Sequence, residues 1–306
     1  MVTPYHKRWK VSSKTAIPLQ SEMEDAGKIQ SWIFDGYNTG FRGNQNRLYM
    51  IRRIAKYKDL LFVFTWREFT IRYRQSLIGV SWAIIQPISM MLLFTIIFSY
   101  IMPQRISDIP YPVFFYAGLL PWTFFASSMN YSVPSLTNHY NLITKIYFPR
   151  EILPLSGIIV AGIDLIIASF FFIILMLFYK IPFTLNALWS IPLFLMLLIF
   201  TISVSLLFAA LNVYYRDVKL ATNFLMQLWF FASPVIYSID KLAIKWKILL
   251  FLNPLTFIIE NIRRVLLENR SVVWWQFLFV CAVILLVYKL SYAFFVRIER
   301  AFADVI

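Results

Sequence analysis

The residues of this chain that could do chemistry are few and scattered. Its two histidines, His6 and His139, stand far apart, and its single cysteine, Cys281, lies within an apolar run. A zinc site takes about four ligands from His, Cys and carboxylate side chains, so these residues predict no metal centre. Neither a Gly-x-Ser-x-Gly nucleophile motif nor the phosphate-binding motif GxxxxGK[ST] occurs. The sequence therefore predicts no catalytic residue and no cofactor bound by this chain.

Asp164, in the stretch AGIDLIIASF, is the one carboxylate well inside a long apolar run. An ionisable residue at membrane depth is costly and is a functional candidate by default. It can serve a proton relay or an ion site, or it can hydrogen-bond a neighbouring helix. A relay needs a chain of such groups, and no other apolar run carries an acid at its centre. The structural role is therefore favoured, and a secondary transporter that runs on Asp164 stays an alternative.

The composition indicates a membrane protein. Of the 306 residues, 60% are hydrophobic and only 14% are charged, whereas soluble domains average about 25% charged residues. The net charge is +14, and 14 of the 29 basic residues precede Ser76. This bias places the N-terminus in the cytoplasm and favours contact with anionic lipid headgroups. Since the charge is explained by topology, nucleic-acid binding is not predicted.

Six apolar runs, each near the roughly 20 residues that cross a bilayer, predict an all-α membrane protein with six transmembrane helices. Alternating loops put 21 basic residues inside and 8 outside, with both termini in the cytoplasm. We expect a cytoplasmic extension at 1–57, a transmembrane domain at 78–295 and a cytoplasmic tail at 296–306. The six runs are Ile78–Met102, Val113–Val133, Leu155–Tyr179, Leu188–Val213, Val218–Tyr237 and Val272–Phe295.

The segment 58–77, KDLLFVFTWREFTIRYRQSL, predicts an amphipathic interface helix before the first span. At 100° per residue it has one aromatic face and a second, narrower apolar face, with Arg67, Arg72 and Arg74 among the residues between them. Two apolar faces indicate a helix wedged between lipid and another protein surface. The first face holds Phe62, Trp66, Phe69, Tyr73 and Leu77, and the second holds Leu60, Phe64 and Ile71.

The loop between the fifth and sixth runs, at about 240–271, predicts two short outer helices separated by Asn253 and Pro254. Each is too short to cross the bilayer, so we expect both to dip into the outer leaflet and return. Arg263 and Arg264 in the second helix can meet diphosphate headgroups or hold these re-entrant helices in place. The sequence leaves both roles open.

Six stretches, in family order, resemble the transmembrane permeases of polysaccharide-exporting ABC transporters, which export O-antigen, capsule and teichoic acid. The similarity spans about residues 56–300, and the stretches are specific as a set rather than singly. They are IRYRQSLIGVSWAIIQP (71–87), YPVFFYAGLLPWTFF (111–125), NLITKIYFPREILPLS (141–156), NVYYRDV (212–218), SPVIYS (233–238) and LNPLTFIIENIRRVLL (252–267).

The resemblance implies a homodimer that pairs with two copies of a separate ATPase subunit, which binds ATP and Mg. It implies export of an undecaprenyl-diphosphate-linked polysaccharide, foremost O-antigen, across the bacterial inner membrane. The first and fifth spans would line the channel, and the outer helices, with Asn253, Pro254, Arg263 and Arg264, would narrow its exit. The channel-lining candidates are Trp82, Phe94, Phe98, Phe224, Trp229, Phe230 and Phe231.

The resemblance also implies a cytoplasmic coupling helix, which enters a cleft of the ATPase, at about 138–150. Its apolar residues Leu142, Ile143, Ile146 and Tyr147 share one helical face, which suits a groove on a partner. Pro149 should end this helix, and Pro154 should lie in the first turn of the next. The residues implied in coupling are Tyr140, Asn141, Leu142, Ile143, Lys145, Ile146, Arg150 and Glu151.

The interface helix would also touch the ATPase, with Arg67, Arg72 and Arg74 near the approach of the lipid diphosphate. Arginine suits phosphate through charge-assisted, bidentate hydrogen bonds. Positive-inside anchoring explains these arginines equally well. Further alternatives are a membrane glycosyltransferase, for which no acidic or histidine-rich catalytic loop is visible, and an ABC exporter of related architecture for capsule, teichoic acid, lipid or drug.

Overall fold

The computed structural model describes residues 55–74, 76–101, 109–146, 148–239, 242–299 and 302, and every regular element among them is a helix. The prediction of an all-α protein is confirmed. Most of the extension at 1–57, Tyr147, and residues 300–301 and 303–306 of the tail lie outside the described residues.

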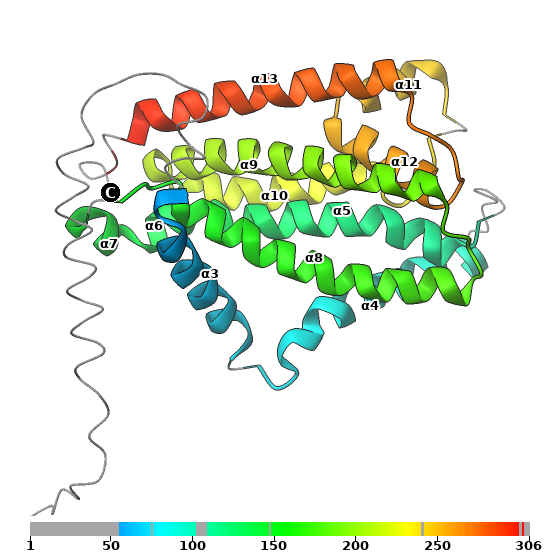
Figure 1. Ribbon diagram of the computed structural model, residues 1–306, viewed down its shortest axis with the longest axis horizontal. Helices are drawn as coiled ribbons and strands as arrows, with labels where there is room; N and C mark the ends of the chain where they lie inside the picture. The colour runs from blue at the N-terminus through cyan, green and yellow to red at the C-terminus, as the bar shows by residue number, and fades with distance from the viewer. Residues whose placement is uncertain are drawn as a thin grey trace, which may run out of the picture.

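The bundle is built around α5 (Tyr111–Ser132), whose side chains are mostly buried inside the chain. Helices α8 (Ile152–Phe178), α9 (Ser190–Tyr214) and α13 (Trp274–Glu299) run roughly along the bundle with it (Figure 1). Gly157 permits the close approach of α8 to α5, because a Cβ there would lie 2.8 Å from the Cβ of Tyr131. Small residues of this kind let membrane helices pack closely.

Among the described residues, four helical stretches are long and apolar enough to cross a membrane: Gly79–Ser99, Ile152–Phe178, Leu185–Tyr214 and Trp274–Glu299. They correspond to the first, third, fourth and sixth predicted spans. The second corresponds to α5, whose 22 residues include tyrosines, prolines and serines that lower its hydropathy. The fifth corresponds to α10 (Asp217–Ala232), which has only 16 residues.

The predicted end of the fifth span is corrected by the local backbone, whereas the first span lies within one residue of its predicted bounds. Helix α10 ends at Ala232 rather than Tyr237, because Pro234 has no N–H and disfavours the helical conformation at Ser233. The first span begins with a short 3-10 turn, η1 (Gly79–Ser81). It continues through α4 (Trp82–Ile96) and ends in a π-helical turn, η2 (Ile97–Ile101).

The remaining helices lie at the two ends of the bundle. Helix α3 (Lys58–Tyr73) starts beside α6 (Ser135–Asn138) and α7 (Tyr140–Lys145) at the end where α13 finishes (Figure 1). Helices α11 (Ile244–Phe251) and α12 (Pro254–Leu266) lie at the opposite end, near the short η3 (Leu185–Trp189). Two short helices are therefore present within 240–271, and Leu252 and Asn253 lie between them.

Candidate functional site

An ion pair ties α3 to the middle of α8. The Arg72 guanidinium donates to one carboxylate oxygen of Asp164, and the Tyr73 hydroxyl donates to the other. The Arg72 guanidinium also lies over the ring of Tyr131, 4.8 Å from its centroid. Asp164 is thus a helix-packing group, and its partners come from α3 rather than from a neighbouring span.

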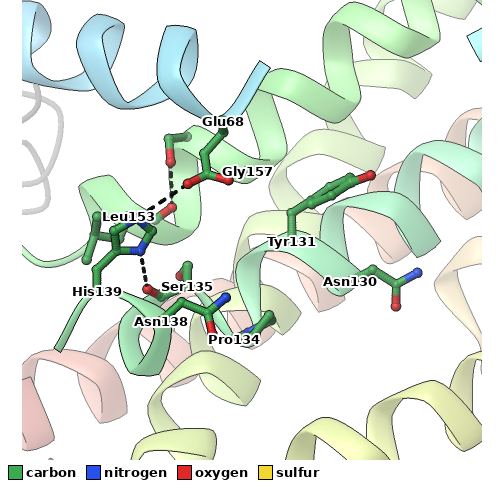
Figure 2. Close-up of a pocket in the computed structure, with 10 residues that line it drawn as sticks. Glu68, Asn130, Tyr131, Pro134, Ser135, Asn138, His139, Leu153 and Gly157 are labelled. Atoms are coloured by element: carbon green, nitrogen blue, oxygen red, sulfur yellow. Dashed lines mark hydrogen bonds and ion pairs between the residues drawn. The ribbon is translucent and has the colours of Figure 1, made fainter. Parts of the chain in front are cut away.

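A second contact joins α3 to the turn between α6 and α7 (Figure 2). Nε2 of His139 lies 3.4 Å from Oε1 of Glu68, and Nδ1 lies 2.8 Å from the carbonyl oxygen of Ser135. Both groups border a polar cavity of about 110 Å³. The wall of this cavity is formed by Glu68, Asn130, Tyr131, Pro134, Ser135, Asn138, His139, Leu153, Ser156 and Gly157.

This second contact predicts a pH-dependent stability. The hydrogen bond to Glu68 raises the pKa of His139 above its ordinary value of 6.5, against the opposing effects of burial and Arg67. A raised pKa in the folded state adds stability below about pH 6.5 that is lost as the pH rises through the folded value. The melting temperature in detergent should fall between pH 6 and pH 8, and the His139→Gln variant should lose most of that slope. An equal slope in this variant contradicts the assignment.

In the described part of the predicted coupling segment 138–150, the helical stretch is α7 (Tyr140–Lys145) rather than one helix over the whole segment, and α6 (Ser135–Asn138) ends where the segment begins. Helix α6 ends before His139, and α7 ends at Lys145 with Ile146 already extended, three residues before Pro149. Pro154 lies in the first turn of α8, as predicted.

The apolar face of this segment is directed largely into the chain itself. Ile143 is only 4% exposed, and Leu142 and Ile146 pack partly buried against the core. The prediction that this face meets a partner is corrected for Ile143. The surface open to a partner is instead formed by Tyr140, Asn141, Thr144 and Lys145.

The corner between α7 and α8 is held by the end of α13. The backbone N–H of Arg150 donates to Oε1 of Glu299 at 3.3 Å, and its guanidinium donates to the Glu299 carbonyl. That guanidinium also lies 5.7 Å from the centre of the buried Phe302 ring. Glu151 is fully buried beside them. Arg150 and Glu151 therefore serve the packing of this corner.

At the opposite end of the bundle, Arg263 is buried and hydrogen-bonds the backbone of two other segments. Its Nε donates to the carbonyl of Phe114 at 3.1 Å, and Nη1 and Nη2 donate to Pro234 and Val235 at 2.5 and 2.6 Å. Nη1 also lies 3.2 Å from Oε1 of Glu260. Of the two roles left open for Arg263, the structure supports the one that holds α12 in place.

Asn253 and Pro254 begin α12 in a regular way. Pro254 is the first helical residue, and the Asn253 side chain accepts a hydrogen bond from the Leu255 N–H at 3.1 Å. Asn253 also donates to Ser233 in the segment after α10, at 2.9 Å. Arg264 is half-buried, and its Nε has no hydrogen-bond partner among the described residues.

The channel-lining candidates separate into an inner and an outer group. The inner group, Phe94, Phe98, Trp229 and Phe230, joins the aromatic core around α5; the rings of Phe94 and Phe115 lie 4.9 Å apart. The outer group, Trp82, Phe224 and Phe231, is about half exposed or more. The outer group is therefore the more open of the two to a partner, lipid or substrate.

The contact between Glu68 and His139 could not be predicted from the sequence. A lone histidine at a helix break carries no signal of its partner, which here comes from 71 residues earlier in the chain. Among the described residues, no three His, Cys, Asp or Glu side chains gather where they could hold a metal ion.

Residues 59–267 match the family described as ABC-2 type transporter. The O-antigen export system permease protein RfbA of Klebsiella pneumoniae is 29% identical over 250 residues, which cover 81% of this chain and 95% of the relative. RfbA of Myxococcus xanthus is 30% identical over 227 residues, 72% of this chain and 85% of the relative. The polysialic acid transport protein KpsM of Escherichia coli is 26% identical over 211 residues, which cover 66% of this chain and 79% of the relative. The chain therefore belongs to the ABC-2 type transporter family, as a permease subunit that has no ATPase site of its own.

Proposed function

We propose that this chain is the channel-forming permease of an exporter that moves an undecaprenyl-diphosphate-linked polysaccharide, of the O-antigen class, across the bacterial inner membrane. The observation that carries this proposal is the similarity along 95% of the length of an O-antigen export permease. Two copies of the chain would work with two copies of a separate ATPase subunit. Each copy would cross the membrane six times and keep both termini in the cytoplasm.

Dimerisation is supported by the exposed apolar surface of α4 and α10. Trp82 on α4 is 47% exposed, and Phe224 and Phe231 on α10 are 60% and 64% exposed. A second copy beside these helices would enclose a pathway walled by aromatic rings. Ring faces accept the C–H surfaces of sugars without the tight polar contacts that would trap a moving polymer.

The basic residues of α3 support an approach route for the lipid diphosphate. Arg67 and Arg74 are exposed, whereas Arg72 is committed to Asp164. Arginine binds phosphate through bidentate, charge-assisted hydrogen bonds. We therefore assign the headgroup approach to Arg67 and Arg74 and the anchoring of α3 to Arg72.

A capsule exporter is the second candidate, supported by the similarity to KpsM. Deletion of the gene in its host bacterium separates the two candidates. We expect lipid-diphosphate-linked O-antigen to accumulate inside the cell and to disappear from the surface while capsule export continues. Loss of surface capsule with normal O-antigen would overturn the proposal in favour of the second candidate.

The exposed face of α7 provides a test of contact with the ATPase. Tyr140 is 47% exposed, and a tyrosine buried by a partner often contributes about 2 kcal/mol, or roughly thirty-fold in affinity. Tyr140→Glu should therefore weaken co-purification with the ATPase and reduce export by about that factor, without lowering the melting temperature. Tyr140→Phe is the matched control and should behave as wild type.

The buried neighbour of Tyr140 should respond differently. Ile143→Glu places a charge in the core of this chain, so we expect it to lower the melting temperature and the yield. If Tyr140→Glu binds the ATPase and exports glycan normally, α7 does not contact the ATPase.

A further inference from the structure

We propose that Asn212 is a positioning residue that links α6 mechanically to the first turn of α10. The inference rests on the proposed function, because it assumes that the ATPase acts near α6 and α7 and that α10 borders the pathway. Asn212 lies near the end of α9 and is only 2% exposed. Its side-chain amide bonds to both neighbouring elements.

On one side, Asn212 caps α10 from a distance of seven residues. Its Oδ1 accepts a hydrogen bond from the backbone N–H of Lys219 at 3.1 Å. The first turn of any helix leaves its N–H groups without partners inside the helix. Among the described residues, the local cap position Arg216 makes no side-chain capping bond. Asn212 therefore takes the role that a local capping residue would have.

On the other side, Asn212 reaches the helix that precedes α7. Its Nδ2 donates to the hydroxyl of Thr137 at 3.2 Å, and this hydroxyl donates in turn to the carbonyl of Pro134 at 3.0 Å. Helix α6 is fixed in the chain by Leu136, which is fully buried. A direct series of hydrogen bonds thus joins α6 to α10. It runs from Pro134 through Thr137 and Asn212 to Lys219.

This arrangement can transmit a displacement because it is short and centred on the buried Asn212 side chain, which hydrogen-bonds the half-buried Thr137 and the backbone of Lys219. Hydrogen bonds in such surroundings are stronger than in water, and breaking one leaves a buried polar group without a partner. A push on α7 and α6 would move Thr137, and the Asn212 amide would carry that movement to the start of α10. The exposed side chains Leu220 and Phe224 on α10 would move with it.

The experiment uses the full permease with its ATPase subunit in proteoliposomes and measures glycan exported per ATP hydrolysed. Thr137→Val removes the acceptor while keeping the shape, and Thr137→Ser keeps the hydroxyl as the matched control. We expect Thr137→Val to lower the export ratio by about five-fold, with continued ATP hydrolysis, and Thr137→Ser to equal wild type. Asn212→Ala should lower the ratio at least as much. A normal ratio in Thr137→Val, with a defect only in Asn212→Ala, would reduce Asn212 to a local cap and overturn the inference.

A second measurement does not depend on the identity of the glycan. Nitroxide labels on cysteines introduced at the exposed Asn138 on α6 and Leu220 on α10, in a Cys281→Ala background, report the distance between the two helices. The inference requires this distance to stay constant when ATP binds, since the two helices move together. A change in this distance contradicts the inference. This measurement does not need the Thr137→Val variant, so it holds even if that variant does not assemble with the ATPase. If the wild-type complex hydrolyses ATP but does not export the glycan, the proposed substrate is wrong. The distance between the two labels still shows whether α6 and α10 move together.

Discussion

Replacing Arg263 with methionine is expected to destabilise the permease by about 3–5 kcal/mol, the cost of removing one partner from a buried charged network. The substitution would leave the carbonyls of Phe114, Pro234 and Val235 without their donor. It would also remove the guanidinium that lies 3.7 Å from the centre of the Phe114 ring. Thermal unfolding of the purified permease in detergent measures the effect.

The Arg263 prediction has two internal controls. Arg264→Met, one position along the same helix, should cost much less, because its Nε already lacks a partner among the described residues. Gly118→Ala should destabilise by about 1–3 kcal/mol, because the added Cβ would lie 2.4 Å from Nη2 of Arg263. Equal losses for Arg263→Met and Arg264→Met would contradict the assigned role of Arg263.

Breaking the ion pair between Arg72 and Asp164 should release α3 from the bundle. Asp164→Leu leaves the Arg72 guanidinium and the Tyr73 hydroxyl without their shared acceptor, so we expect a loss of about 3 kcal/mol. Arg74→Met, two residues along α3 at an exposed position, should change stability by less than about 0.5 kcal/mol.

Release of α3 can be followed separately from global unfolding. Phe64 packs between His139 and Phe148 and is 6% exposed. A Phe64→Cys variant, in a Cys281→Ala background, should react slowly with maleimide, and adding Asp164→Leu should make it react quickly. Slow labelling in both variants would show that α3 stays docked without the ion pair.

The same position separates an ATP-driven exporter from a proton-driven transporter. Asp164→Asn keeps one acceptor oxygen, for either the Arg72 guanidinium or the Tyr73 hydroxyl, and removes the proton-binding carboxylate. We expect export to continue with an unchanged pH dependence. Export that stops while α3 remains docked would support a proton relay at Asp164.

The helical class and most helix boundaries could be predicted because they depend on local sequence. The apolar runs that became α8, α9 and α13 match the predicted spans within a few residues. The predicted end of the fifth span was wrong. The apolar sequence continues through Val235 and Ile236, whereas the helix ends at Ala232, before Pro234.

The site contacts could not be predicted, because they join residues distant in sequence. Arg72 and Asp164 are 92 positions apart, and Arg263 and Phe114 are 149 apart. The sequence identified Asp164 as a costly charge at membrane depth and left two roles open for Arg263, but the partners of both side chains depend on how the helices pack. Ile143 shows the same limit, since a helical apolar face can serve the chain's own core as readily as a partner.

The central claim is that this permease moves a lipid-linked glycan with energy supplied by a separate ATPase. The most direct measurement reconstitutes the purified permease in liposomes with an undecaprenyl-diphosphate-linked glycan and follows the appearance of the glycan on the opposite face. We expect transfer only when the ATPase subunit and ATP with Mg are both present. Transfer by the permease alone under a proton gradient, or its absence in a complex that hydrolyses ATP, would contradict the account.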